Sequence, residues 1–263
     1  VRITHRDEFG LPTDPTLNVA GVALRALIDA AGIDFGFDVE IVKHIKPGSG
    51  IGSSAASACG AVVAANHLLE HKFSHVELVE LAMAGEMIAS GSRHADNLAP
   101  CIYGGFTLVR SSEPLDIVEI AFPDLYATVI HPQIEVKTSE ARAMLPKDVP
   151  LAEAVRNWSN LGAFVAALAS GDLDLMARSM VDTIVEPARQ ALIPKFAELK
   201  AASLAAGAIG GGISGSGPSV FMLSESRAIA EYVREAMNIV YGPTGIDFNT
   251  YVSRISPHGV RVA

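Results

Sequence analysis

The stretch PGSGIGSSAA at residues 47–56 places three glycines and three serines between two apolar runs. The run before it, FDVEIVKHI at residues 37–45, alternates apolar and polar side chains with the period of a half-buried strand. Residues 55–69 carry small or apolar side chains at nearly every position, as a helix buried on most sides does. The sequence therefore predicts a strand, a glycine-rich loop and a helix in that order.

A glycine-rich loop at the start of a helix can bind an anion, because the first turn of a helix exposes unpaired N–H groups and a partial positive charge. Gly48, Gly50 and Gly52 can adopt positive φ or let phosphate oxygens approach the backbone. Ser53 and Ser54 add hydroxyl donors. A tight turn capped by Ser53 explains the same residues without a ligand. The loop contains no lysine and does not match the GxxxxGK[ST] signature, so it is not a Walker loop.

Composition limits the partners of this chain. Its 263 residues are 49% hydrophobic, enough to bury the core of one large or two modest domains. A net charge of −9 argues against nucleic acid as a partner, since phosphate backbones attract basic surfaces. Cys59 and Cys101 stand in apolar sequence without metal-ligand spacing, which predicts buried thiols in a reducing compartment. Residues 53–69 are too short and too rich in small side chains to span a bilayer, so no membrane partner is expected.

Periodicity and breaker residues organise the rest of the chain into an α+β fold in two halves that join near Pro123, giving domains at residues 1–122 and 123–263. A second glycine cluster, GGGISGSGPS, occupies residues 210–219. We expect helices at residues 15–31, with Gly32 as terminator, and at 76–90, 150–169, 173–191, 194–206 and 227–238; we expect strands at 107–109, 117–121, 127–130, 220–223 and 251–255.

The string KPGSGIGSSAA resembles the ATP loop of the GHMP small-molecule kinases, which include galactokinases, homoserine kinases and mevalonate kinases. Residues 213–219, ISGSGPS, look like the C-terminal glycine motif of that family, which lies beside the phosphate loop. The resemblance implies a two-domain GHMP kinase fold with an N-terminal ribosomal-protein-S5-like α/β domain and a C-terminal ferredoxin-like domain. It also implies that ATP is bound by Pro47, Gly48, Ser49, Gly50, Ile51, Gly52, Ser53, Ser54, Ala55, Gly215, Ser216 and Gly217.

A loop without lysine needs another positive charge beside the phosphates, and Mg²⁺ held by a carboxylate and a hydroxyl can supply it. Glu86 lies in the otherwise uncharged stretch LAMAGEMIAS, where an unpaired carboxylate would be costly. The pattern alone favours a solvated or paired surface role for Glu86. The family resemblance implies that Glu86 binds Mg²⁺ together with Ser54.

The string RHADNLAPCIYGG at residues 93–105 resembles the homoserine kinase branch of this family. The resemblance implies that His94 and Asn97 line the amino-acid pocket, with Asn97 facing the reacting hydroxyl. A helix cap or a turn is the alternative role for both residues. Asp96 is expected to be structural, although an aspartate serves as the base in mevalonate and galactose kinases.

Residues 131–146 and 185–196 also resemble that branch, and each contributes one arginine. By resemblance, Arg142 and Arg189 bind the carboxylate of the substrate, with Thr138 as a nearby hydroxyl. The planar guanidinium suits this task because it can donate two parallel hydrogen bonds to a carboxylate.

The homoserine kinase branch opens with an ANLGPGFD-like segment, whereas this chain begins VRITHRDEFGLPTDP, which looks like the part that follows. We therefore expect a few dozen residues to precede it, and a fragment truly lacking them could bind nucleotide without catalysis.

The resemblance as a whole implies ATP- and Mg²⁺-dependent phosphorylation of L-homoserine for threonine synthesis, in the cytoplasm or in a plant plastid. A homodimer is one option for its assembly. Another GHMP kinase acting on mevalonate or a sugar, or a catalytically silent ligand-binding relative, are the alternatives.

Overall fold

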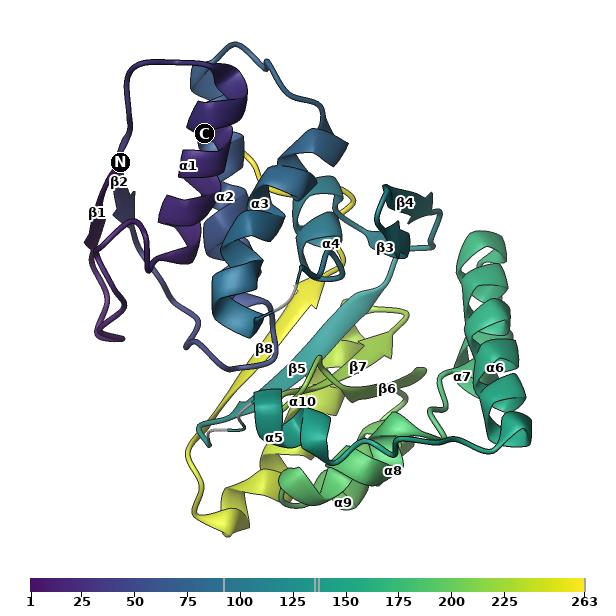
Figure 1. Ribbon diagram of the computed structural model, residues 1–263. Coiled ribbons are helices and arrows are strands. Elements are labelled where there is room, and N and C mark those ends of the chain that lie inside the picture. The colour runs from purple at the N-terminus through teal and green to yellow at the C-terminus, as the bar shows by residue number, and fades with distance from the viewer. Residues whose placement is uncertain (92, 135, 137, 263) are drawn as a thin grey trace. The chain divides into compact units, whose positions relative to one another are not determined.

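The computed structural model describes residues 1–91, 93–134, 136 and 138–262, with backbone only for residues 90 and 138–140. The strands are β1 (Arg2–His5), β2 (Asp38–Ile41), β3 (Phe106–Ser112), β4 (Leu115–Ile120), β5 (Tyr126–Pro132), β6 (Gly210–Ile213), β7 (Val220–Ser224) and β8 (Phe248–Arg254). The helices are α1 (Val19–Ala31), α2 (Ser53–Leu68), α3 (His75–Ser90), α4 (Leu98–Tyr103), α5 (Thr138–Ala143), α6 (Leu151–Ser170), α7 (Leu173–Ser179), α8 (Val185–Arg189), α9 (Phe196–Ala205) and α10 (Arg227–Tyr241), with short 3₁₀ turns at Gln190–Leu192 and Gly242–Thr244 (Figure 1).

The chain divides into two compact units. The first comprises residues 1–47, 52–120 and 256–263, and the second comprises residues 48–51 and 121–255. The tip of the glycine loop therefore belongs to the second unit, whereas the helix that follows the loop belongs to the first.

Helices α1 to α4 pack around the core of the first unit, which includes Leu24, Leu27, Val62 and Met83. Small side chains allow the close approach of these helices. A Cβ atom on Gly85 of α3 would lie 2.3 Å from the carbonyl oxygen of Val19 in α1, so only glycine fits there. Strands β1 and β2 form a parallel pair, and β3 and β4 form an antiparallel hairpin.

The predicted helix at residues 15–31 is confirmed from Val19 onward. Its start is set by Asn18, whose side chain accepts hydrogen bonds from the N–H groups of Ala20 and Gly21. Its end is set by Gly32, which has φ of 65° in the left-handed region, as predicted.

The predicted strand at residues 37–45 is too long. Strand β2 ends at Ile41, because its parallel partner β1 ends at the paired residue His5. Residues 42–45 therefore leave the ladder, and Lys43 and Ile45 are released to contact the start of α2.

The second unit contains a four-stranded antiparallel sheet in the order β6-β7-β5-β8. Helices intervene between β5 and β6, and α10 lies between β7 and β8. This βαββαβ order is that of a ferredoxin-like domain, as the family resemblance implies. Helices α9 and α10 pack on the sheet through a core that includes Phe196, Leu199, Met222 and Met237.

The prediction of a single helix over residues 173–191 is wrong. Helix α7 ends at Ser179, and α8 begins at Val185. Between them, the Asp182 carboxylate accepts hydrogen bonds from the N–H groups of Ile184, Val185 and Glu186. A new helix start is thereby capped in the middle of the predicted element.

The first residues of the second glycine cluster form strand β6, which the sequence did not predict because glycine is depleted in strands. Gly211 is required there by close approach to β7, since a Cβ atom would lie 2.0 Å from the carbonyl oxygen of Phe221.

Candidate functional site

The glycine loop adopts a backbone that only glycine takes readily. Gly48, Gly50 and Gly52 have φ of 73°, 78° and 77°, all in the left-handed region. Gly52 is the N-cap residue of α2 and has no side chain with which to cap it. The expectation that Ser53 caps a tight turn is wrong, because Ser53 is the first helical residue and its Oγ donates to the carbonyl oxygen of Ile45 at 3.0 Å.

The two glycine motifs lie against each other within the second unit. Ser214 Oγ donates to the carbonyl oxygen of Gly50 at 2.8 Å, and Ser219 Oγ donates to that of Ser49 at 2.6 Å. A Cβ atom on Gly50 would lie 2.6 Å from the carbonyl oxygen of Ser214. Motifs more than 160 residues apart in the sequence are thus brought together, as the resemblance implies.

The remaining residues expected at the nucleotide differ in burial. Pro47 and Gly215 are exposed, and Ile51 and Ser216 are half-buried. Gly217 is buried near Ile193 with φ of 83°. Ala55, in the first turn of α2, packs its side chain into the core of the first unit.

Ser54 and Glu86 meet in the first unit. Ser54 Oγ donates to Glu86 Oε2 at 3.3 Å, and Glu86, on α3, is 9% exposed. Hydroxyl and carboxylate oxygens are ligands that Mg²⁺ prefers. The described residues contain no group of three or more His, Cys, Asp or Glu side chains that could hold a metal by themselves. A Mg²⁺ ion held here would take its other ligands from phosphate oxygens and water, as is usual where Mg²⁺ binds with a nucleotide.

The RHADN segment lies before α4 in the first unit. His94, Asp96 and Asn97 are exposed, and Ala95 between them is buried. Asn97 occupies the N-cap position of α4, yet within the described part of the chain its side chain makes no capping hydrogen bond. The helix-cap alternative for Asn97 therefore does not account for its side chain.

Arg189 and Arg142 are neighbours in the second unit. Arg189 donates from Nε to the carbonyl oxygen of Ala141 at 3.1 Å and from Nη1 to that of Gly215 at 3.2 Å. Burial, followed by the like charge of Arg142, lowers the pKa of Arg189. Two guanidinium groups held together favour an anion between or beside them. The side chain of Thr138 lies outside the described part of the structure.

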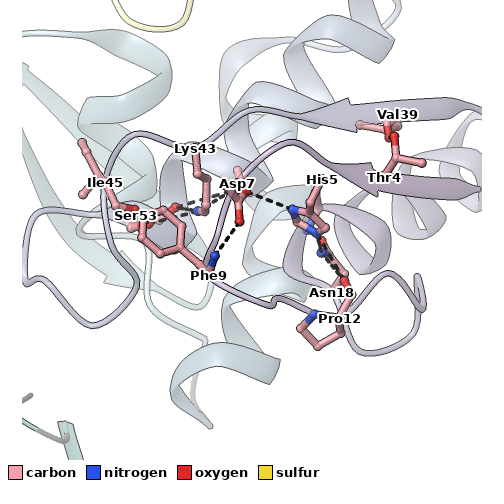
Figure 2. A network of polar contacts seen from close by, with 12 residues as sticks. Thr4, His5, Asp7, Phe9, Pro12, Asn18, Val39, Lys43, Ile45 and Ser53 are labelled. Carbon is pink, nitrogen blue, oxygen red and sulfur yellow. Dashed lines mark hydrogen bonds and ion pairs between the residues drawn. The ribbon is translucent and has the colours of Figure 1, made fainter.

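Lys43 was missed by the sequence analysis, which looked for a lysine only inside the loop. Its Nζ donates to the carbonyl oxygen of Ser53 at 2.6 Å and to Ser53 Oγ at 3.0 Å (Figure 2). It also donates to Ser57 Oγ at 2.7 Å. The available signal was the lysine at the end of the alternating run, ten residues before the helix.

Comparison with known proteins agrees with this geometry. Residues 18–105 match the family described as GHMP kinases N terminal domain, and residues 164–242 match GHMP kinases C terminal. The chain therefore belongs to the GHMP kinases.

Within that family it belongs to the homoserine kinases. It is 43% identical to the homoserine kinase of Chlorobium phaeobacteroides, over 97% of this chain and 83% of the relative. It is 42% identical to that of Thermococcus kodakarensis, over 94% of this chain and 82% of the relative. The crystal structure of homoserine kinase from Cytophaga hutchinsonii superimposes with a TM-score of 0.94 at 47% identity, covering 98% of this chain and 83% of that one.

A more distant match shows the fold alone. The crystal structure of L. major mevalonate kinase in complex with R-mevalonate superimposes with a TM-score of 0.71 at 18% identity, over 98% of this chain and 82% of that one. Separately, no helix among the described residues is long and apolar enough to cross a membrane.

Proposed function

We propose that this protein transfers the γ-phosphoryl group of Mg-ATP to the side-chain hydroxyl of L-homoserine, giving O-phospho-L-homoserine for threonine synthesis. The observation that carries the proposal is the contact between Ser54, at the start of α2 directly after the positive-φ loop, and Glu86 on α3. Its 43–47% identity to homoserine kinases supports the choice of acceptor over mevalonate or a sugar.

The loop amides and the N-terminus of α2 bind the phosphates in this proposal. Gly48 and Gly52 leave room for phosphate oxygens near the backbone, whereas Gly50 allows the close approach of Ser214. The helix dipole favours the negative charge of the phosphates. Glu86 and Ser54 hold Mg²⁺, which neutralises charge as it develops on the phosphate oxygens. The second glycine cluster holds the loop through the hydrogen bond from Ser214 to Gly50, and its residues Gly215, Ser216 and Gly217 are assigned to ATP binding.

The arginine pair binds the carboxylate of the amino acid. Two backbone carbonyl groups accept hydrogen bonds from Arg189, so its guanidinium group is pre-organised. The adjacent positive charge of Arg142 favours the binding of an anion. We assign His94, Asn97 and Thr138 to the same substrate. A sugar or another uncharged acceptor has no need of such a pair.

Catalysis in this proposal depends on orientation and charge stabilisation without a carboxylate base. The amide of Asn97 does not take a proton at ordinary pH, so its task is to orient the hydroxyl toward the γ-phosphate. The exposed Asp96 is assigned a structural role. We further assign residues 1–122 to an N-terminal ATP-binding domain and residues 123–263 to a C-terminal domain, with residues 256–263 packing in the first compact unit and residues 48–51 in the second.

Identification of the product tests the proposal. Incubation of the full-length protein with Mg-ATP and L-homoserine should give a new phosphomonoester signal in ³¹P NMR, with a mass equal to that of homoserine plus one phosphoryl group. Nucleotide binding in calorimetry without that product would favour a silent ligand-binding relative.

A further inference from the structure

Lys43 is a partly buried cation at the start of α2. All three hydrogens of its ammonium group are used, two on Ser53 and one on Ser57. Ser53 Oγ in turn donates to the carbonyl oxygen of Ile45. The segment that leaves β2 is thereby fastened to the first turn of α2, immediately beside Ser54.

This placement is unfavourable for a cation in the absence of a ligand. The N-terminus of a helix carries a partial positive charge, so a lysine there is repelled by the helix dipole. Lys72 shows the favourable arrangement in the same unit, because its Nζ donates at 2.5 Å to the carbonyl oxygen of Ala31 at the C-terminus of α1. Burial also lowers the pKa of Lys43. An anion at the start of α2 would offset both costs.

A network of polar contacts supplies a partial counter-charge. The Asp7 carboxylate, whose side chain is 2% exposed, opposes the effect of burial on the pKa of Lys43. Asp7 accepts from the N–H of Phe9 at 3.1 Å and lies 3.3 Å from Nδ1 of His5 (Figure 2).

The far end of this network reaches His5 and Asn18. Asn18 caps α1 through Oδ1, so its Nδ2 is the donor toward His5 Nε2 at 3.1 Å. His5 Nε2 also lies 3.4 Å from the carbonyl oxygen of Pro12, and Nδ1 faces Asp7. The network therefore links the start of α1 to the charge that acts on Lys43.

We propose that Lys43 is a positioning residue for nucleotide binding: it holds the first turn of α2 through Ser53 and supplies the positive charge that the glycine loop itself lacks. The inference rests on the proposed function, because the anion it serves is the polyphosphate of ATP. It assigns to Asp7 the opposite role, that of balancing Lys43 when the phosphates are absent.

Equilibrium binding to the full-length protein tests this assignment. Lys43→Gln keeps a hydrogen-bond donor and removes the charge. It should weaken binding of Mg-ATP and Mg-ADP by about tenfold, an effect between those of a close charge pair in water and of one near a protein surface. Adenosine, measured by competition, should bind as to the parent. Lys43→Arg should recover most of the loss. Lys72→Gln is the matched control. It removes a comparable contact between a lysine and a backbone carbonyl group, at the C-terminus of α1, and should leave nucleotide affinity unchanged.

Asp7→Asn gives a prediction of opposite sign. It leaves the charge of Lys43 unbalanced, so the protein without nucleotide should melt earlier while Mg-ATP affinity stays at the parental value or rises. If the network acts only as a scaffold, Lys43→Gln and Asp7→Asn should both lower the affinity for Mg-ATP. That result would overturn the proposal.

Parental Mg-ATP affinity in Lys43→Gln, or an equal loss of adenosine affinity, would also overturn it. If Lys43→Gln fails to fold, Lys43→Arg and Asp7→Asn decide the question. Parental ATP affinity in both variants would support the proposal, and weakened ATP binding in either would contradict it. Failure of the parent protein to bind Mg-ATP would contradict the proposed function itself. A measurement on the parent protein alone shows this, so the two failures can be distinguished.

Discussion

Ser54 Oγ donates a hydrogen bond to Glu86 Oε2 at 3.3 Å, joining residues that stand 32 positions apart on two packed helices. The serine lies in the first turn of α2, and the glutamate is nearly buried on α3. A nearly buried carboxylate beside a hydroxyl offers the oxygen ligands that a hard cation prefers.

Glu86→Gln should lower turnover by about 100-fold or more, since even residues that only orient a metal ligand are worth on the order of 10–100-fold. The side-chain volume is kept, and the amide can still accept from Ser54, so the melting temperature should barely change. Activity across a Mg²⁺ titration and thermal melting give the two readouts. Parental turnover at every Mg²⁺ concentration would remove Glu86 from the metal site.

Glu80→Gln is the matched control for this variant. Glu80 lies on the same helix but is exposed, so loss of its charge should change neither turnover nor the Mg²⁺ requirement.

Substitutions at three glycines separate backbone strain from crowding. Gly50→Ala should destabilise the protein by more than about 2 kcal/mol, because a Cβ atom would clash with carbonyl oxygens of Ser214 and Gly217 in addition to the strain of positive φ. Gly52→Ala should cost only about 1 kcal/mol, the strain alone, since no described atom lies within 4 Å of its Cβ position.

Nucleotide affinity should nevertheless fall in Gly52→Ala, because the methyl group occupies space left open beside the loop amides. Gly60→Ala, in the middle of α2 with open space around it, should instead stabilise by about 0.5–1 kcal/mol. Denaturant unfolding and calorimetry with Mg-ATP measure the two effects. Unchanged ATP affinity in a folded Gly52→Ala protein would reduce the loop to a turn.

Arg189→Ala and Arg142→Ala should each raise the KM for homoserine by roughly 30-fold or more, corresponding to about 2–5 kcal/mol for an enclosed carboxylate that loses its partner. The KM for ATP should change little in Arg142→Ala. Arg189→Ala also removes the bond to Gly215, so a small rise in the KM for ATP is expected there.

Arg178→Ala, an exposed arginine at the end of α7, serves as the control and should leave both KM values unchanged. An equal rise in the KM values for ATP and homoserine in Arg142→Ala would indicate that Arg142 contacts the nucleotide.

Acid should weaken the helix that carries Arg189. Burial raises the pKa of Asp182, but its hydrogen bonds to three backbone N–H groups and to Asn157 outweigh that effect and leave the pKa lowered. A carboxylate whose pKa is lower in the folded protein stabilises it above the unfolded pKa of about 3.9, and this stabilisation is lost as pH falls through the folded value.

Asp182→Ala should therefore cost about 1 kcal/mol near neutral pH, as for other lost helix caps. The difference in unfolding free energy between parent and variant should shrink as pH is lowered below about 4. Urea unfolding over a pH series measures it. A difference that stays constant to pH 2 would show that the charge of Asp182 contributes nothing.

The strand, loop and helix around the first glycine motif could be predicted because each depends on local pattern. Alternation marked β2, small residues marked α2, and the glycines marked the positive-φ turn between them. The contact between Gly50 and Ser214 could not be derived from spacing, since it depends on how the second unit folds, and only the family resemblance implied it.

Lys43 and Asp182 show what local pattern does not reveal. Both contact the start of a helix, Lys43 from another segment and Asp182 from the preceding turn. The periodicity of apolar residues identifies neither of them as functional. Apolar periodicity continued through residues 180–184, and the cap at Asp182 overrode it.

The most direct test of the central claim is acceptor-dependent ADP release by the full-length protein with Mg-ATP, compared across L-homoserine, L-serine, mevalonate and galactose. We predict rapid release with L-homoserine, in a one-to-one ratio with O-phospho-L-homoserine, and release near background with the other three. Faster release with mevalonate or galactose, or no dependence on any acceptor in a protein that binds Mg-ATP, would contradict the assignment.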